Sequence, residues 1–179
     1  MFFEKGETMS EEEKKFLEIV DLKKGFGSGE TRQEVLRGMN FSVAKGEFCV
    51  LLGPSGSGKS TLLNIIGGID GADAGSITIQ GEQLEDMNEK KLSLYRRKHL
   101  GYIFQMYNLI PNLTAVENVE LPLIYRGVSR SVRQELSREA LKKVGLEHRM
   151  DHKPSEMSGG QQQRVAIARA IAQAPPVIL

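Results

Sequence analysis

The sequence has little of what several protein classes require. Its 179 residues include one cysteine, Cys49, which excludes a disulfide framework. Basic and acidic residues number 24 and 23, so the net charge of +1 gives no electrostatic reason to expect a nucleic-acid partner. No apolar run reaches the roughly 18 residues of a membrane helix, and the charged N-terminus is unlike a signal peptide. We therefore expect one cytosolic domain with a sizeable core.

A glycine-rich stretch lies between an apolar run and a helical pattern. The run 48–52 lacks alternation, which predicts a strand covered on both faces of a parallel sheet, and Cys49 within it is predicted to be buried. Glycines of this kind turn backbone N–H groups inward as a nest for phosphate, and the following helix adds its positive end. The stretch fits the pattern Gly-x4-Gly-Lys-Ser and consists of Gly53, Pro54, Ser55, Gly56, Ser57, Gly58, Lys59, Ser60 and Thr61.

Two side chains of this loop have predicted roles with a nucleotide. Lys59 is expected to reach the outer phosphates, and the Ser60 hydroxyl is expected to bind Mg²⁺. The alternative is an ordinary glycine-rich turn before a helix. The flanking strand and helix patterns favour nucleotide binding.

The remaining segments alternate between strand and helix patterns. Residues 1–15 are predicted to form a mobile arm, and a loop at 23–30 contains Phe26, either a plain loop anchor or a residue that stacks on a purine ring. An N-terminal hairpin is predicted to lead into the run 48–52. The expected strands are 16–22, 35–43, 77–79, 100–104 and 177–179, and the expected helices are 88–98, 114–125 with a kink or break at Pro122, and 131–144 with Val132, Leu136, Ala140, Leu141 and Val144 on its apolar face.

A second glycine signal opens a further helix near the C-terminus. Ser158 is a natural N-cap, and the two glycines after it leave backbone N–H groups open to approach. Taken alone, this pattern is more typical of an ordinary capped helix. The residues concerned are Ser158, Gly159, Gly160 and Gln161, and the helix is expected to continue to Ala172.

In combination, these motifs resemble the ATP-binding-cassette (ABC) ATPases. Met157-Ser158-Gly159-Gly160-Gln161 is similar to the family signature, with Met in the place usually held by Leu. Gln105, after Gly101-Tyr102-Ile103-Phe104, is similar to the Q-loop glutamine, and Phe26 lies where the family carries an adenine-stacking aromatic. The stretch 101–119 is most similar to the lipoprotein-release, macrolide-export and antimicrobial-peptide-export ATPases.

The resemblance implies an α/β P-loop NTPase fold over residues 16–179. It implies a parallel-sheet core, an N-terminal antiparallel β subdomain, and a helical subdomain at about 106–160 that carries the signature. ATP and Mg²⁺ are the implied cofactors, with Gln105 contacting the metal or the attacking water. The implied partners are a second cassette, in a homodimer whose signature residues contact the partner's nucleotide, and an integral membrane permease. The implied location of this chain is the cytoplasm, peripheral at the inner face of the cell membrane.

Two alternatives stay open at this stage. In the family, an aspartate and a glutamate follow the strand at 177–179 and a histidine comes later. We therefore expect a C-terminally truncated cassette that binds nucleotide with little hydrolysis. The other alternative is a soluble, non-transport ABC protein, but the segment 60–157 is too short for the coiled-coil insertion of such relatives.

Overall fold

The computed structural model describes residues 15–179, and these fall into two compact units. Unit 1 runs through Leu92 and unit 2 is Ser93–Leu179. All of the predicted N-terminal arm except Lys15 lies outside the described residues. Lys15 itself begins the first strand. The proposed division into arm, cassette and helical subdomain stays a prediction.

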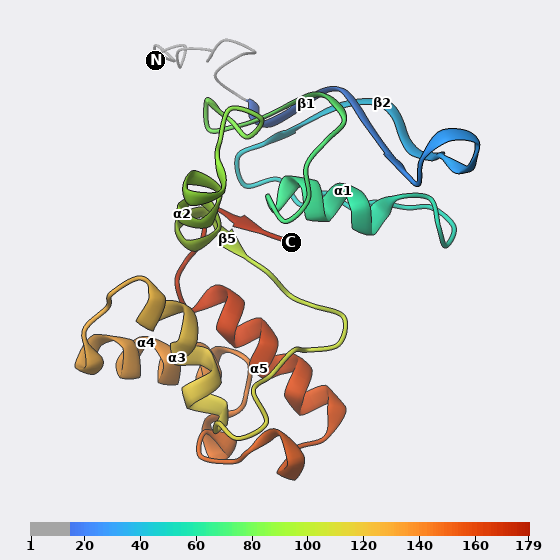
Figure 1. Ribbon diagram of the computed structural model, residues 1–179. Helices are drawn as coiled ribbons and strands as arrows, with labels where there is room; N and C mark the ends of the chain where they lie inside the picture. The colour runs from blue at the N-terminus through green and yellow to red at the C-terminus, as the bar shows by residue number, and fades with distance from the viewer. Residues whose placement is uncertain (1–14) are drawn as a thin grey trace, which may run out of the picture. The chain divides into compact units, whose positions relative to one another are not determined.

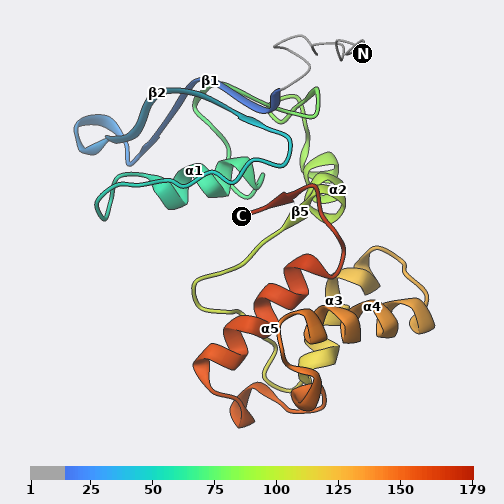
Figure 2. The same cartoon turned by 180° about the vertical axis from the view of Figure 1, so that it is seen from behind.

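Unit 1 is built on an antiparallel sheet with the strand order β2-β1-β3-β4. A long hairpin of β1 (Lys15–Phe26) and β2 (Gln33–Ala44) encloses the short helix η1 (Gly29–Thr31), and helix α1 (Lys59–Ile66) lies alongside it (Figures 1 and 2). Strands β3 (Ala74–Ile79) and β4 (Glu82–Gln83) complete the sheet. The predicted hairpin and its antiparallel subdomain are therefore confirmed.

The core of unit 1 consists of buried residues of α1 and of the strands. The spacing of apolar residues in α1 puts Leu62, Ile65 and Ile66 on one side of the helix. Leu17 and Ile19 of β1, and Ile77 and Ile79 of β3, follow the period of two of a pleated strand, and a register shift in β1 sets Leu22 three residues after Ile19. These buried strand residues are Leu17, Ile19, Leu22, Leu36, Ile77 and Ile79.

Unit 2 is mainly helical. Helix α2 (Glu89–His99) spans the boundary between the units, and α3 (Ala115–Tyr125), α4 (Arg130–Lys143) and α5 (Gly159–Ile171) follow. The short helices η2 (Glu147–Arg149) and η3 (Pro154–Glu156) connect α4 to α5. Strands β5 (Leu100–Gly101) and β6 (Val177–Ile178) pair in parallel.

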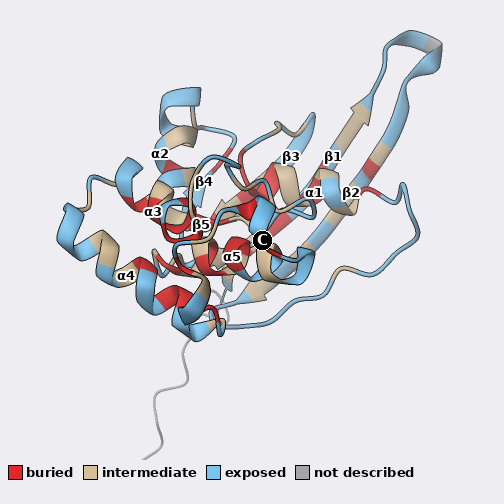
Figure 3. Cartoon of the chain, turned by 90° about the horizontal axis from the view of Figure 1, so that it is seen from below, coloured by how far each residue is buried: buried red, intermediate tan, exposed pale blue. Residues whose placement is uncertain are grey.

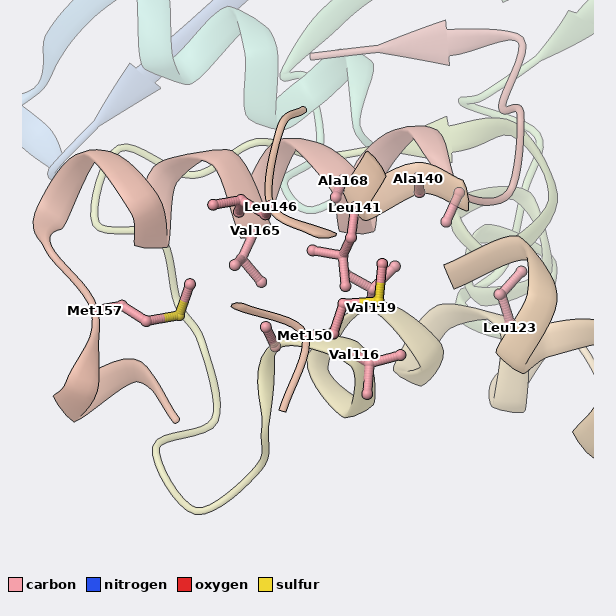
Figure 4. Close-up of a cluster of buried hydrophobic side chains, with 12 residues drawn as sticks. Val116, Val119, Leu123, Ala140, Leu141, Leu146, Met150, Met157, Val165 and Ala168 are labelled. Carbon is pink, nitrogen blue, oxygen red and sulfur yellow. The ribbon is translucent and has the colours of Figure 1, made fainter. Parts of the chain in front are cut away.

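The core of unit 2 lies between α3, α4 and α5. Figure 4 shows Val119, Leu141 and Val165 pointing into this space from the three helices. Met157, which stands in the place of the family's signature leucine, is 7% exposed and belongs to the same cluster. An unbranched Met fills such a site with little penalty.

The prediction of a buried strand at residues 48–52 is wrong. This segment forms no strand, and Phe48 and Leu52 are 90% and 89% exposed. Among the described residues no neighbouring strand pairs with it, and an apolar run without a ladder partner is neither a strand nor buried. Cys49 is accordingly exposed, contrary to the expected buried thiol.

Smaller differences concern element ends. Of the predicted strand 100–104, only Leu100 and Gly101 form a strand. Beyond them, Ile103 N donates a hydrogen bond of 2.8 Å to Leu179 O and continues the pairing. Helix α3 continues through Pro122 without a break, and helix α4 buries Ala140 and Leu141 while Val132 stays 45% exposed in its first turn (Figure 3). Within the described residues, none of the helices is both long and apolar enough to cross a bilayer.

Candidate functional site

The glycine-rich loop turns into α1 at Gly58, the N-cap of the helix. Gly58 has φ +88°, a left-handed conformation that side chains disfavour. A Cβ at Gly58 would lie 2.8 Å from Val35 Cγ1 and 2.9 Å from Leu36 Cδ2, so the backbone packs directly on β2. Glycine is therefore required both by the turn and by the close approach that places the start of α1 against β2.

The Lys59 ammonium group lies over the loop that precedes it. Its Nζ donates to the carbonyl oxygens of Gly53 at 2.7 Å and Pro54 at 2.6 Å, and to Ser57 Oγ at 3.3 Å. These three bonds use the three donors of an ammonium group. The positive charge is therefore held at the mouth of the loop, where an anion that approaches the backbone amides would meet it.

The first turn of α1 is suited to an anion. No side chain caps its N-terminus, and no acidic residue lies in the first turn. Helix N-termini carry partial positive charge and N–H groups without intrahelical partners. Ser60 lies exposed in this turn. Backbone amides, an ammonium group and a hydroxyl, which are donors that a phosphate site uses, thus all belong to this loop and the first turn of α1.

Phe26 lies in unit 1 close to the same loop. Phe26 pairs with Gln33 at the end of the β1–β2 ladder. Val35, whose side chain lies against Gly58, is two residues further along β2. Two residues of strand correspond to roughly 7 Å. Phe26 is 47% exposed and therefore presents an open aromatic surface near the loop.

In unit 2, Gln105 stands at the tip of a turn. Tyr107 N donates to Phe104 O at 3.2 Å, which makes Phe104–Tyr107 a β-turn with Gln105 and Met106 at its corners. Gln105 is exposed. The parallel ladder that ends near Ile103 anchors the entry to this turn, so the amide side chain projects from a fixed support.

The signature segment caps its own helix. Ser158 Oγ accepts from Gln161 N at 3.3 Å, while Ser158 N donates to Gln161 Oε1 at 2.8 Å, forming a capping box. Gln162 Nε2 donates to the carbonyls of Pro154 and Met157 and fixes the preceding turn. The amides of Gly159 and Gly160, at the first two helical positions, are not those that the box uses, and both glycines are exposed.

The structure brings the Gln105 turn and the signature together through two contacts. Arg169, in α5, donates from Nη1 to Asn108 O and from Nη2 to Tyr107 O, both at 2.7 Å. A Cβ at Gly159 would lie 3.4 Å from the Tyr107 hydroxyl oxygen, so this ring reaches the first signature glycine. Burial lowers the pKa of the Arg169 guanidinium from its ordinary value.

The residues held by Arg169 have an unusual backbone. Tyr107 and Asn108 have φ values of +55° and +47°. Left-handed backbone is tolerated by Asn but is an outlier for a bulky residue such as Tyr. Such residues persist where the surroundings determine them, and the guanidinium fork supplies that constraint.

Sequence reasoning missed Arg169 and also Asn118, which anchors the far end of the same loop. Asn118 is fully buried, and its Oδ1 accepts from Ile110 N at 2.7 Å. Its Nδ2 lies within 3.1 Å of three carbonyl oxygens, those of Ile110, Leu113 and Thr114. A buried asparagine among the apolar residues of a helix was the available signal, because such a side chain needs partners.

Comparison with known proteins decides the family. The model of the ABC transporter family matches residues 36–179. The chain belongs to the ABC transporter ATP-binding proteins. It is 50% identical over 166 residues to an uncharacterized ABC transporter ATP-binding protein of Thermotoga maritima, covering 93% of this chain and 71% of that one. It is also 50% identical over 163 residues to the lipoprotein-releasing system ATP-binding protein LolD of Geobacter metallireducens, covering 91% and 72%.

Further similarities extend to a fused transporter and to solved structures. The macrolide export ATP-binding/permease protein MacB of Mannheimia succiniciproducens is 48% identical over 163 residues, which cover 91% of this chain and 25% of that protein. The dimeric structure of MJ0796, a bacterial ABC transporter cassette, has a TM-score of 0.84 at 44% identity and covers 90% of this chain and 72% of that one. A dimeric post-hydrolysis state of MJ0796 bound to ADP and Pi has a TM-score of 0.83. The predicted cassette fold and family are thereby confirmed.

The ABC family binds ATP with Mg²⁺, and the residues present are compatible with that metal. Ser60 and Gln105 each offer a neutral oxygen, the ligand type that Mg²⁺ accepts alongside phosphate and water. No group of three or more His, Cys, Asp or Glu side chains suited to a metal occurs in the part of the chain that the structure describes. The roles of individual residues stay predictions.

Proposed function

We propose that this ABC protein binds Mg-ATP through the loop 53–61. Lys59 contacts the outer phosphates, the amides of the loop and of the first turn of α1 surround them, and Ser60 binds Mg²⁺. Phe26 stacks on the base. The observation that carries this proposal is the start of α1, where an uncapped first turn without acidic residues lies beside an ammonium group held at 2.6–2.7 Å from loop carbonyls.

The signature segment is proposed to act on the nucleotide of a second copy. Gly159 and Gly160 offer exposed amides at the start of α5, which suits a γ-phosphate. Gln105 contacts Mg²⁺ or the attacking water, and phosphoryl transfer to water then depends on positioning and charge stabilisation. The dimeric cassettes at 44% identity, one of them bound to ADP and Pi, support a homodimer.

A membrane permease is the proposed partner in transport. The name of the relative MacB combines an ATP-binding part and a permease, and the name of the relative LolD refers to a lipoprotein-releasing system. The matched segment covers 25% of MacB. The proposed permease is a separate integral membrane protein, and this chain is proposed to lie against it at the inner face of the cell membrane. Export or lipoprotein release is the proposed process, powered by nucleotide-dependent association of two cassettes.

Calorimetric titration of the full chain with Mg-ATP tests the nucleotide site. Lys59→Ala removes the charge at the mouth of the loop, and we expect an affinity loss of at least about tenfold, because charge-assisted contacts contribute about 1.5–3 kcal/mol. Lys45→Ala is the matched control, since Lys45 is exposed in the turn after β2. Equal affinities of the two variants would refute the assignment of Lys59.

Sedimentation velocity tests the second copy. We expect the mass of the protein to double on addition of Mg-ATP when hydrolysis is slow, and Lys59→Ala to remain monomeric under the same conditions. A glutamate at Gly160 would place a carboxylate among the signature amides. Gly160→Glu should therefore bind nucleotide like the unmodified chain and yet fail to dimerise. Nucleotide-dependent dimers of Gly160→Glu would contradict the proposed role of the signature.

A further inference from the structure

A single carboxylate ties together both strands of the β1–β2 hairpin next to Phe26. Asp73, which directly precedes β3, accepts the Gly25 amide on Oδ2 at 2.8 Å and Arg32 Nη2 on the same oxygen at 2.6 Å. Gly25 is the residue before Phe26 in β1, and Arg32 immediately precedes β2. Asp73 therefore fixes the two chain segments between which the aromatic ring is presented.

The Arg32 guanidinium packs directly on this part of β1. A Cβ at Gly25 would lie 3.0 Å from Arg32 Nε, so the guanidinium rests against the backbone of Gly25. The ion pair between Arg32 and Asp73 thus packs against the backbone of Gly25, the residue before Phe26. Because a side chain at residue 25 would displace the guanidinium, the glycine there is part of the same arrangement.

A second cation lies over the ring itself. Lys24 Nζ is 5.4 Å from the centroid of the Phe26 ring, within the range of a cation–π contact. The same Nζ donates to Asp70 Oδ1 at 3.0 Å and to Gly71 O at 2.6 Å, and it lies 3.7 Å from Asp73 Oδ1. Since the Lys24 side chain is only 13% exposed, the ammonium group is held in one place rather than free in solvent.

Lys24 covers only part of the ring. Phe26 keeps 47% of its surface exposed, and this surface is close to the loop that binds phosphate, because β2 connects the Phe26 pairing partner Gln33 to the Gly58 contact at Val35. Stacking on an aromatic ring suits any flat base, because every base has a π-face. The Lys24 ammonium group thus lies against the ring, and Asp73 holds the adjacent backbone at Gly25.

We propose that Asp73 is a positioning residue for nucleobase binding, acting through Gly25, Arg32 and Lys24 on the platform formed by Phe26. This inference rests on the proposed function of the loop 53–61 and extends it to the base. Asp73 does not touch the nucleotide. It preorganises the ring, so that binding the base does not have to order the end of the hairpin.

The charge on Asp73 persists under ordinary conditions. The hydrogen bond from the Gly25 amide is the main cause that lowers the pKa of the Asp73 carboxyl below the usual aspartate value, with Arg32 and Lys24 acting in the same direction. The carboxylate is therefore available to hold its partners throughout the neutral range.

The test compares two probes on the full chain by calorimetric titration. Mg-ATP carries phosphates and a base, whereas Mg-tripolyphosphate carries the phosphates alone. The variants are Asp73→Ala, Asp73→Asn, which keeps an acceptor for the Gly25 amide, and Phe26→Ala. Glu18→Ala is the matched control, because Glu18 forms an exposed ion pair with Lys15 on the same strand.

The expected pattern separates the base from the phosphates. Asp73→Ala should weaken Mg-ATP by about 2- to 13-fold, the cost of ordering one side chain on binding. Phe26→Ala should weaken it by about 5- to 150-fold, the range for one stacked base. Asp73→Asn should fall between Asp73→Ala and the unmodified chain. Tripolyphosphate affinity should be unchanged in all of these, and Glu18→Ala should change neither probe.

Different results overturn different claims. If Asp73→Ala binds Mg-ATP like the unmodified chain, or weakens both probes equally, Asp73 does not act through the base and this inference is wrong. If the unmodified chain binds neither probe, or Lys59→Ala binds both as well as before, the proposed nucleotide site itself is wrong.

Discussion

Replacing Arg169 should release the Gln105 turn from the signature helix. The guanidinium makes two bonds of 2.7 Å to adjacent carbonyls, and each hydrogen bond to a charged group contributes about 1.5–3 kcal/mol. Water can satisfy the Asn108 carbonyl after the change, since Asn108 is exposed, so that bond counts for less than the bond to half-buried Tyr107. Arg169→Met, which keeps most of the apolar stem, should therefore cost about 2–3 kcal/mol.

The cost should appear locally as well as globally. Tyr107 stores strain of about 1–3 kcal/mol in its left-handed backbone, and it relaxes once the fork is gone. A local change of about 2–3 kcal/mol corresponds to a loss of hydrogen-exchange protection of about 30- to 140-fold. The amides to monitor are those of Tyr107 and Asn108, which donate to Phe104 O and Met106 O.

Two further variants make the assay specific. Arg169→Lys keeps the charge but not the planar fork, so it should lose part of the protection. Arg164→Ala changes an arginine of the same helix that is exposed and makes a single 3.3 Å bond to Val144 O, so it should cost less than about 0.5 kcal/mol. If Arg169→Met and Arg164→Ala gave the same exchange rates for the amides of Tyr107 and Asn108, the two Arg169 hydrogen bonds would not stabilise this turn.

Two other predictions concern stability. Asn118→Ala removes the fully buried amide side chain that accepts from Ile110 N at 2.7 Å and bonds three carbonyl oxygens. It should lower the free energy of unfolding by about 2–4 kcal/mol, measured by urea denaturation. A loss no larger than that of exposed Asn112→Ala would contradict the anchoring role. The Thr114 amide and hydroxyl lower the pKa of the Glu117 carboxyl, so the unfolded chain binds more protons than the folded chain in acid. The capping box should therefore stabilise the fold fully above about pH 5 and lose its effect as the pH falls through the lowered pKa, and a Glu117→Gln variant with an unchanged acid slope would exclude this contribution.

Elements with a strong local pattern could be predicted from the sequence. The apolar spacing of α4 and the capping residue of α5 are local signals, and the structure ends both helices within a residue or so of the expected bounds. The phosphate loop is recognisable for the same reason, since Gly58 and Lys59 act within one turn of chain. Local chemistry of this kind needs no knowledge of the partner segment.

Features that depend on a partner could not be predicted. Apolar content at 48–52 indicates a strand only when another strand lies beside it, and this stretch has no such neighbour in the described part of the chain. Arg169 contacts carbonyls 61 and 62 residues away, and Asp73 contacts an amide 48 residues away. No local sequence pattern indicates either contact, and from the sequence alone both side chains would be interpreted as solvated surface charges.

The two glycine-rich helix starts are built in opposite ways, and this difference assigns them different thermodynamic behaviour. The start of α5 is complete in itself, because Ser158 and Gln161 cap each other and Gln162 holds the preceding turn. The start of α1 has no side-chain cap, and its loop is closed by Lys59, whose bonds to Gly53 and Pro54 must adjust when the ammonium group meets phosphate. A preorganised surface loses little conformational entropy on binding, whereas a loop that its ligand must close becomes ordered only when the ligand binds. Nucleotide should therefore order the loop 53–61 first, whereas the start of α5, proposed to meet the nucleotide of a second cassette, should change little on binding.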